Sequence, residues 1–185
     1  MFKYSKVAQI AAVFADKQGG TINVLKLIKL MYLADRESMD RTGFPISFDR
    51  LVSMEHGPVL SRTLNLINGA LDARGAAKWD EWISDRENHD VSVKRTFDRS
   101  DLDELSDADL DAIYAVWAQF GGMDKWTLRD YTHKYLGEWK DPEGSMFPIE
   151  EKSVFLALGI EEEEAEKLSI DIEAERGLDK VLSTL

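Results

Sequence analysis

The chain has 185 residues, no cysteine and a formal net charge of -12. This length allows one domain to bury a core without a metal ion or a disulfide, and the lack of cysteine excludes a disulfide framework and thiolate-bound zinc. The first residues lack the apolar core of a signal peptide, and no stretch is apolar for long enough to cross a bilayer. We therefore expect a soluble, cytoplasmic protein.

The negative charge is concentrated in the second half of the chain. Residues 1–100 hold 15 Lys and Arg against 13 Asp and Glu, whereas residues 101–185 hold 8 against 22. An acidic surface repels phosphate backbones and attracts basic partners. The distribution argues against nucleic-acid binding and leaves two interpretations open: a solubilising surface, or a surface that binds a basic protein.

Apolar spacing predicts helices through most of the first half. Residues 4–17 repeat apolar side chains at helical intervals, and a second helix is expected over residues 22–41, with Gly43 just beyond its end. Pro58 is expected to open a third helix, because the first helical position does not need an N–H group.

The pattern changes after residue 75. Residues 79–95 contain a polar turn between Trp82 and the alternating pair Val91 and Val93, which predicts a short β-hairpin. Ser106 followed by Asp109 is a capping box, so we expect a helix to begin there.

The remaining segments are also predicted to be helical. Thr127 with Asp130 is expected to cap one helix, and Pro148 to open a short one. Residues 161–176 form an acidic helix whose leading glutamates suit the positive end of the helix dipole.

Together these elements predict a mainly α fold. We expect a compact multi-helix domain over residues 1–160, with one small β-hairpin near residues 79–95. Residues 161–185 are expected to form an acidic helical extension that packs on this domain or flanks it.

One carboxylate interrupts the apolar face of the second helix. On a helical wheel Lys26 and Lys29 lie on the polar side, whereas Asp35 falls among apolar residues. An unpaired buried charge is costly, so Asp35 is protonated, paired or placed at an opening in the core. The partners considered are His56, Arg62 and His133. Asp35 therefore has either a structural or a functional role.

The same residues could in principle perform chemistry. Asp35, His56 and His133 could form an acid/base arrangement, or a metal site together with Glu55. However, the sequence has no His-Glu-x-x-His motif, no phosphate-binding loop, no Gly-x-Ser-x-Gly elbow and no cysteine nucleophile. We therefore expect no catalysis, no metal ion and no cofactor. A hydrolase or transferase that uses Asp35, His56 and His133 is kept as the alternative.

Aromatic residues are numerous, with five Trp, five Tyr and eight Phe. Four tryptophans lie near predicted helix ends or hairpin edges: Trp79, Trp82, Trp126 and Trp139. If these side chains are exposed among acidic residues, they would form a patch suited to a basic protein partner. The other interpretation is that they fill the core.

Two segments suggest a family. Residues 25–34, Leu-Lys-Leu-Ile-Lys-Leu-Met-Tyr-Leu-Ala, are followed by His-Gly-Pro-Val at residues 56–59. This order resembles the SocA-like antitoxin family, the Panacea domain, over roughly residues 1–150. The positions that match the family pattern are Lys26, Leu27, Lys29, Leu30, Tyr32, Leu33, Gly57, Pro58, Val59, His133 and Trp139.

The resemblance implies an antitoxin of a bacterial or phage toxin-antitoxin pair. Such a protein neutralises its cognate toxin by direct contact, without catalysis, and the charge favours a toxin with a basic face. The matched residues would then be mostly architectural, while the toxin-binding surface varies among members. Blocking the toxin, holding it inactive and handing it to a protease all stay open.

The sequence differs from the family pattern in two respects. Glu55 stands where the family pattern favours an aromatic residue nearby, and the chain has no room for the helix-turn-helix domain of some relatives. A mobile-element interaction protein or protease adaptor without a dedicated toxin is the third hypothesis. Self-association is also left open.

Overall fold

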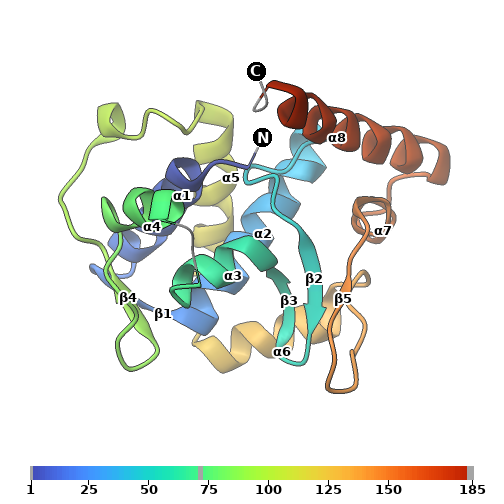
Figure 1. Ribbon diagram of the computed structural model, residues 1–185. Helices are drawn as coiled ribbons and strands as arrows, with labels where there is room; N and C mark the ends of the chain where they lie inside the picture. Colours follow the sequence, from blue (N-terminus) through green and yellow to red (C-terminus); the bar gives the residue numbers. More distant parts are fainter. Residues whose placement is uncertain (1, 71–72, 183–185) are drawn as a thin grey trace.

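The computed structural model describes residues 2–70 and 73–182. Within these ranges the fold is mainly α-helical, as predicted (Figure 1). The helices are α1 (Tyr4–Lys17), α2 (Val24–Thr42), α3 (Ser61–Ile67), α4 (Ala73–Asp80), α5 (Asp107–Phe120), α6 (Lys125–Tyr135), α7 (Glu151–Ala157) and α8 (Glu162–Leu182), with a short 3-10 helix η1 (Arg99–Asp101). The strands are β1 (Thr21–Asn23), β2 (Leu51–Met54), β3 (Gly57–Leu60), β4 (Asp90–Ser92) and β5 (Phe147–Pro148).

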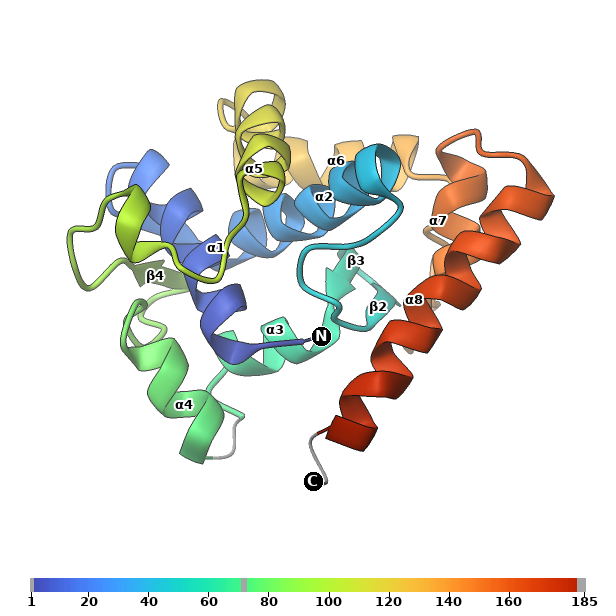
Figure 2. The same ribbon diagram turned by 90° about the horizontal axis from the view of Figure 1, so that it is seen from above.

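Helix α2 is the centre of the molecule, with α1, α5, α6 and β3 packed around it (Figures 1 and 2). Its start is capped by Asn23, whose side chain accepts a hydrogen bond from the Leu25 N–H, and it ends at Gly43 with a φ of 79°. Lys26 and Lys29 are only 7% and 0% exposed. The predicted polar side is therefore wrong for these two lysines, because neighbouring elements cover the first half of the helix, whereas Asp40 near its end is exposed.

A three-stranded antiparallel sheet, in the order β3-β2-β5, lies beside α2. Pro58 belongs to β3, where it is paired with Ser53 of β2, and α3 begins only at Ser61. The predicted helix start at Pro58 is therefore wrong. Residues 57–60 form a strand because β2 offers a pairing partner. Strand β3 lies at the edge of the sheet, where a proline without an N–H group breaks no hydrogen bond of the ladder.

The predicted hairpin over residues 79–95 is present mainly as isolated bridges. Glu87 and Asp90 are bridged, and the two residues between them, Asn88 and His89, have φ values of 49° and 70°. Positive φ at both central positions is typical of a two-residue hairpin turn. The longer ladder of β4 is formed with β1. Strand β1 covers residues 21–23 and therefore includes the first two positions of the predicted second helix.

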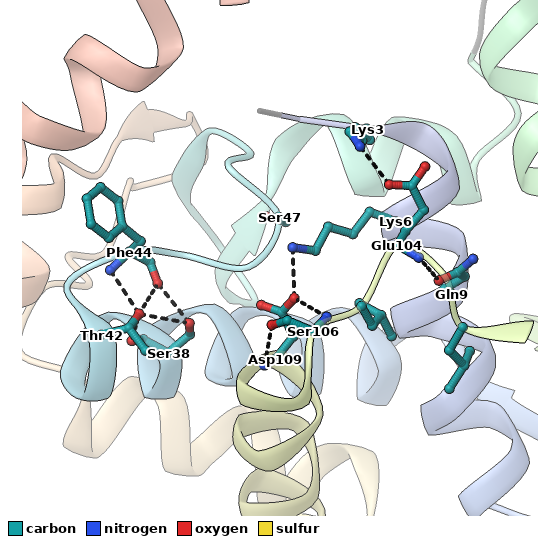
Figure 3. Close-up of polar contacts among 12 residues, drawn as sticks. Lys3, Lys6, Gln9, Ser38, Thr42, Phe44, Ser47, Glu104, Ser106 and Asp109 are labelled. Atoms are coloured by element: carbon teal, nitrogen blue, oxygen red, sulfur yellow. Dashed lines mark hydrogen bonds and ion pairs between the residues drawn. The ribbon is translucent and has the colours of Figure 1, made fainter. Parts of the chain in front are cut away.

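The start of α5 confirms the predicted capping box. The Ser106 hydroxyl accepts the Asp109 N–H at 3.1 Å, and the Asp109 carboxylate accepts the Ser106 N–H at 2.9 Å. The same carboxylate forms an ion pair with Lys6 of α1 at 2.9 Å, as Figure 3 shows. Nearby, the Gln9 side chain accepts the Glu104 N–H at 3.1 Å. These contacts join the start of α5 to α1.

Two other predicted helix starts are wrong. The N-cap of α6 is Asp124, whose carboxylate accepts two N–H bonds from the first turn, so Thr127 with Asp130 does not cap this helix. The sequence offers two cap signals in succession, and the earlier one is used. Pro148 lies in β5, and α7 begins at Glu151 instead.

Helix α8 packs along α7 on the side of the sheet away from α1 and α4 (Figures 1 and 2). It runs through Gly177 to Leu182 and is therefore longer than the predicted 161–176 helix. Ala165 and Ile172 are fully buried. No helix in the described ranges is both long and apolar enough to cross a membrane.

Arg176 connects α8 to two other parts of the chain. Its guanidinium forms an ion pair with Glu151 of α7 at 2.5 Å and donates to the Asp49 carbonyl at 2.8 Å. The acidic helix is thus attached to the domain by apolar burial, by Arg176, and by the ion pairs of Lys152 with Glu162 and Glu166 at 3.1 and 2.8 Å. Its division from residues 1–160 as a separate extension stays a prediction.

Candidate functional site

The two predicted motif segments meet at Lys29 and Pro58. Lys29 projects from α2 and is fully buried, and its ammonium donates to the Pro58 carbonyl of β3 at 2.7 Å. Burial lowers the pKa of Lys29 to about 7. Among the residues that the structure describes, no carboxylate forms an ion pair with it. Lys29 therefore connects α2 to the β2–β3 hairpin through the Pro58 carbonyl.

Gly57 is required by the close approach of α6. Its φ is +91°, and a Cβ at this position would lie 2.6 Å from the Thr132 Oγ1 and 2.9 Å from the Lys29 Nζ. Both values are well below a normal van der Waals contact. A side chain at position 57 would push the β2–β3 hairpin away from α2 and α6.

His133 and Trp139 form the third part of the motif. Their rings are stacked in parallel, with centroids 4.1 Å apart, and the Trp139 Nε1 donates to the Met54 carbonyl at 3.1 Å. Burial lowers the pKa of His133, and the positive charges of Lys29 and Arg129 lower it further. His133 is therefore a neutral ring that packs against the end of β2.

The other motif residues also make internal contacts. The Tyr32 hydroxyl donates to the buried Glu138 carboxylate at 3.1 Å, and the Arg36 Nε donates to the same oxygen at 2.9 Å. Lys26 donates to the Gly121 carbonyl at 2.6 Å. Four apolar motif side chains are buried in the core, namely Leu27, Leu30, Leu33 and Val59.

Asp35 is buried, as the helical wheel predicted, but its partner is a residue that the sequence did not indicate. Its carboxylate accepts the Ser47 N–H at 2.9 Å and a very short bond from the Ser47 hydroxyl. Burial raises the pKa of Asp35 to about 7, although the Ser47 bonds act in the opposite direction. Asp35 therefore anchors the irregular loop between α2 and β2.

The predicted polar cluster is only partly brought together. The His56 backbone lies against His133, whereas the Arg62 guanidinium stacks on the Phe2 ring at 4.5 Å and Asp35 bonds to Ser47. Within the described chain, no group of three or more His, Cys, Asp or Glu side chains could hold a metal ion. The alternative acid/base arrangement of Asp35, His56 and His133 thus has no direct contact between its carboxylate and either ring.

A second buried carboxylate escaped the sequence analysis. Asp49 accepts the N–H groups of Arg62 and Thr63 and the Thr63 hydroxyl, at 2.8–3.0 Å. It therefore caps α3 from the loop before β2. No local sequence signal indicates it, because its partners Arg62 and Thr63 lie 13 and 14 positions further along the chain.

The tryptophans divide between the core and the surface. Trp79 and Trp82 are 5% and 4% exposed, so of the two interpretations core filling holds for them. Trp126 is 50% exposed, and the cationic groups of Lys125 and Arg129 lie 5.3 and 4.9 Å from its ring. The exposed ring is therefore in contact with two cationic groups, while the Asp124 carboxylate accepts the Trp126 N–H at 2.8 Å.

A pocket of about 500 Å³ opens next to this network. Its wall is formed by the first turns of α2 and α6, the β2-β3 turn and the turn before β4. Lys29, His56 and Trp126 are part of this wall, so motif residues and the exposed tryptophan border one cavity.

The part of the chain that holds these contacts matches a known family. The family described as antitoxin SocA-like, Panacea domain, matches residues 27–140, which is more than half of the chain. This protein belongs to the SocA-like antitoxin family. No curated protein and no solved structure matches it.

In this SocA-like protein the matched region contains α2 almost entirely, both sheets apart from β1 and β5, and helices α3 to α6. Helices α1, α7 and α8 lie outside the match. The Lys29–Pro58 bond and the stack of His133 on Trp139 fall within it. Within the matched region Lys29 and His133 contact other motif residues, whereas Lys26 and Tyr32 bond to Gly121 and Glu138.

Proposed function

We propose that this SocA-like protein is an antitoxin that neutralises a cognate toxin by direct protein contact, without catalysis. The observation that carries the proposal is the family match over residues 27–140. The internal contacts of Lys29, His133 and Trp139 support it, because side chains engaged in packing and carbonyl bonds hold a scaffold together. A binding surface is then expected elsewhere, on elements that can differ between members.

The outer face of α7 and α8 is the surface that we assign to the toxin. Helix α8 carries eight acidic and three basic residues, a net charge of -5. Leu156 and Ile170 on this pair of helices are 43% and 56% exposed. Exposed apolar side chains on acidic helices suit a toxin with a basic face, because charge sets the association rate and apolar contact sets the affinity.

Co-expression with the product of the adjacent gene tests this proposal. The wild-type chain is expected to restore growth and to co-purify with the toxin. The double variant Asp35→Asn/His56→Ala is expected to do the same, because Asp35 bonds to a loop and His56 is exposed beside a turn. Loss of rescue by a folded double variant that still binds the toxin would favour the hydrolase or transferase alternative.

The amount of toxin in the rescued cells separates neutralisation by contact from delivery to a protease. Contact alone predicts that the toxin persists in a complex. A protease adaptor predicts that the toxin disappears, and that it returns when the protease gene is deleted. Rescue with neither a complex nor a loss of toxin would contradict both forms of direct binding.

A further inference from the structure

The pocket beside Lys29 is basic in an otherwise acidic protein. Its wall contains the basic side chains Lys29, His56, Arg86, His89 and Lys125. Glu55 supplies the one carboxylate in the described wall of this pocket. The chain as a whole has a net charge of -12, so this local excess of positive charge is not a consequence of composition.

The cations of this pocket lack negative partners among the described residues. Lys29 donates to a carbonyl, at Pro58. The Arg86 guanidinium contacts the Asn68 amide oxygen and the His89 ring nitrogen, both at 2.5 Å. The buried Lys29 ammonium, held by a neutral carbonyl, has not recovered the cost of leaving water, whereas Arg86 is exposed and can reach a ligand. An anion in the pocket would supply the missing negative charge.

Helix α2 adds to the positive potential. The helix begins at the pocket, where the Val24 N–H donates to the His89 carbonyl at 2.8 Å and the Asn23 side chain donates to the Asp90 carboxylate at 2.9 Å, so only part of its positive end faces the cavity. Asn23 also donates to the His89 carbonyl at 3.1 Å, which fixes the turn that carries Arg86 and His89. Helix α6 contributes less, because the Asp124 carboxylate already caps its first turn.

The rest of the wall is apolar and has an aromatic rim. Ile28 and Val59 are buried residues of the wall, and Trp126 is half-exposed at the start of α6. A half-exposed indole offers a face for a planar ring to stack on. The volume of about 500 Å³ lies in the range of small-molecule sites.

We propose that this pocket binds a small phosphate monoester that carries a planar ring, a ligand of the mononucleotide class. A phosphate monoester has a charge close to -2 at neutral pH and therefore matches several cations better than a single carboxylate does. The ring occupies the apolar wall against Trp126, and the phosphate lies among Arg86, Lys125 and the start of α2. This site is separate from the toxin-binding face of α7 and α8 and needs no toxin.

Calorimetric titration of the whole purified chain tests the site. The probes are AMP, GMP, CMP and UMP, with adenosine and inorganic phosphate as separate halves of the ligand. At least one mononucleotide is expected to bind at least tenfold more tightly than adenosine or inorganic phosphate. Binding is also expected to quench tryptophan fluorescence in the wild type, and less so in Trp126→Phe.

Variants of exposed side chains localise the site without disturbing the core. Arg86→Ala/Lys125→Ala is expected to weaken binding at least tenfold, and Trp126→Ala about tenfold, since base stacking on an aromatic ring is worth about 1–3 kcal/mol. Arg41→Ala, an exposed arginine at the other end of α2, is the matched control and is expected to leave affinity unchanged. No binding of any mononucleotide at millimolar concentration, or equal affinity in all variants, would overturn the proposal.

Discussion

Lys29 and Gly57 show how single residues determine the geometry of the scaffold. The lysine ends at the Pro58 carbonyl, and the glycine leaves room for the Lys29 ammonium and the Thr132 hydroxyl. Both residues were identified from the family pattern, yet the wheel placed Lys29 on a polar surface. A wheel describes one helix, whereas the burial of Lys29 results from β3 and α6 packing against α2.

Gly57→Ala tests this close approach, with Gly19→Ala as its control. Both glycines have a positive φ, +91° and +94°, but a Cβ at Gly19 has no atom within 4 Å. Gly19→Ala should therefore show only the backbone cost, about 1–3 kcal/mol. Gly57→Ala should lose about 1–3 kcal/mol more in the free energy of unfolding, because of overpacking. Equal losses in urea denaturation would show that the contact is unimportant.

Asp35 gives a pH-dependent prediction. Its pKa is raised from 3.8 to about 7 in the folded state, so the folded protein binds more protons than the unfolded chain between these values. Stability contributed by this group is therefore present below pH 4 and is lost as pH rises to 7. A shift of about three pKa units corresponds to about 4 kcal/mol.

Urea denaturation of Asp35→Asn at several pH values checks this assignment. The amide does not titrate, so the variant should become more stable relative to wild type as pH rises from 5 to 8. Between pH 5 and 8 the difference is expected to change by about 2.5 kcal/mol, because about two pH units of this range lie below the folded-state pKa of about 7. A difference that is constant with pH would mean that Asp35 is ionised throughout this range in the folded protein.

At the scale of elements, the sequence predicted helices well and strands poorly. The periodicity of α1, α2 and α5 is strong, and the capping box at Ser106 placed the start of α5 correctly. The strands have two to four residues each, which is too short for alternation to be recognised. The pairing of β1 with β4 joins residues about 70 positions apart, and local patterns do not contain that information.

The site was predictable to the same limited extent. The burial of Asp35 follows from its place on the wheel, but Ser47 comes from an irregular loop that has no periodic signal. The basic pocket combines α2 with the β4 turn and α6, three segments that are far apart in the sequence. Its cations could not be distinguished from ordinary surface residues before the fold was known.

The capping box of α5 can be tested with three variants. Ser106→Ala removes one capping bond and should cost about 1 kcal/mol in the free energy of unfolding. Asp109→Ala removes the reciprocal bond and the ion pair with Lys6, so it should cost about 1–2 kcal/mol. Asp111→Ala, on the exposed side of the same helix, should stay within about 0.5 kcal/mol of wild type. A cost at Asp111 equal to that at Asp109 would contradict the assigned role of the box.

At the scale of the whole molecule, opposite charges are separated. Helix α6 carries three basic residues and one acidic residue, whereas α8 has a net charge of -5. These helices lie in different parts of the molecule, with α8 at the top right and α6 at the bottom in Figure 1. This separation is what the two proposals require, because an acidic face attracts a basic toxin and a basic pocket attracts an anionic ligand.

Charge reversal on α8 tests this orientation. Glu163→Lys/Glu164→Lys/Glu173→Lys should slow association with the toxin by at least tenfold at low salt, and the difference should shrink as ionic strength rises.

The matched control makes the same change in net charge on other faces, with Asp40→Lys, Glu87→Lys and Asp111→Lys combined. This control should associate at a rate closer to that of wild type. Equal slowing in both triple variants would mean that total charge matters and that α8 is not the docking face. The measurement is surface-based association kinetics at several salt concentrations.

The most direct test of neutralisation by binding is a titration of toxin activity with the purified antitoxin. Inhibition should rise linearly with added antitoxin and become complete at a fixed stoichiometric ratio, with the complex appearing in size-exclusion chromatography at the same ratio. Inhibition by far less than one equivalent of antitoxin, increasing with time and without a stable complex, would show that the protein transforms its target, and would contradict the account given above.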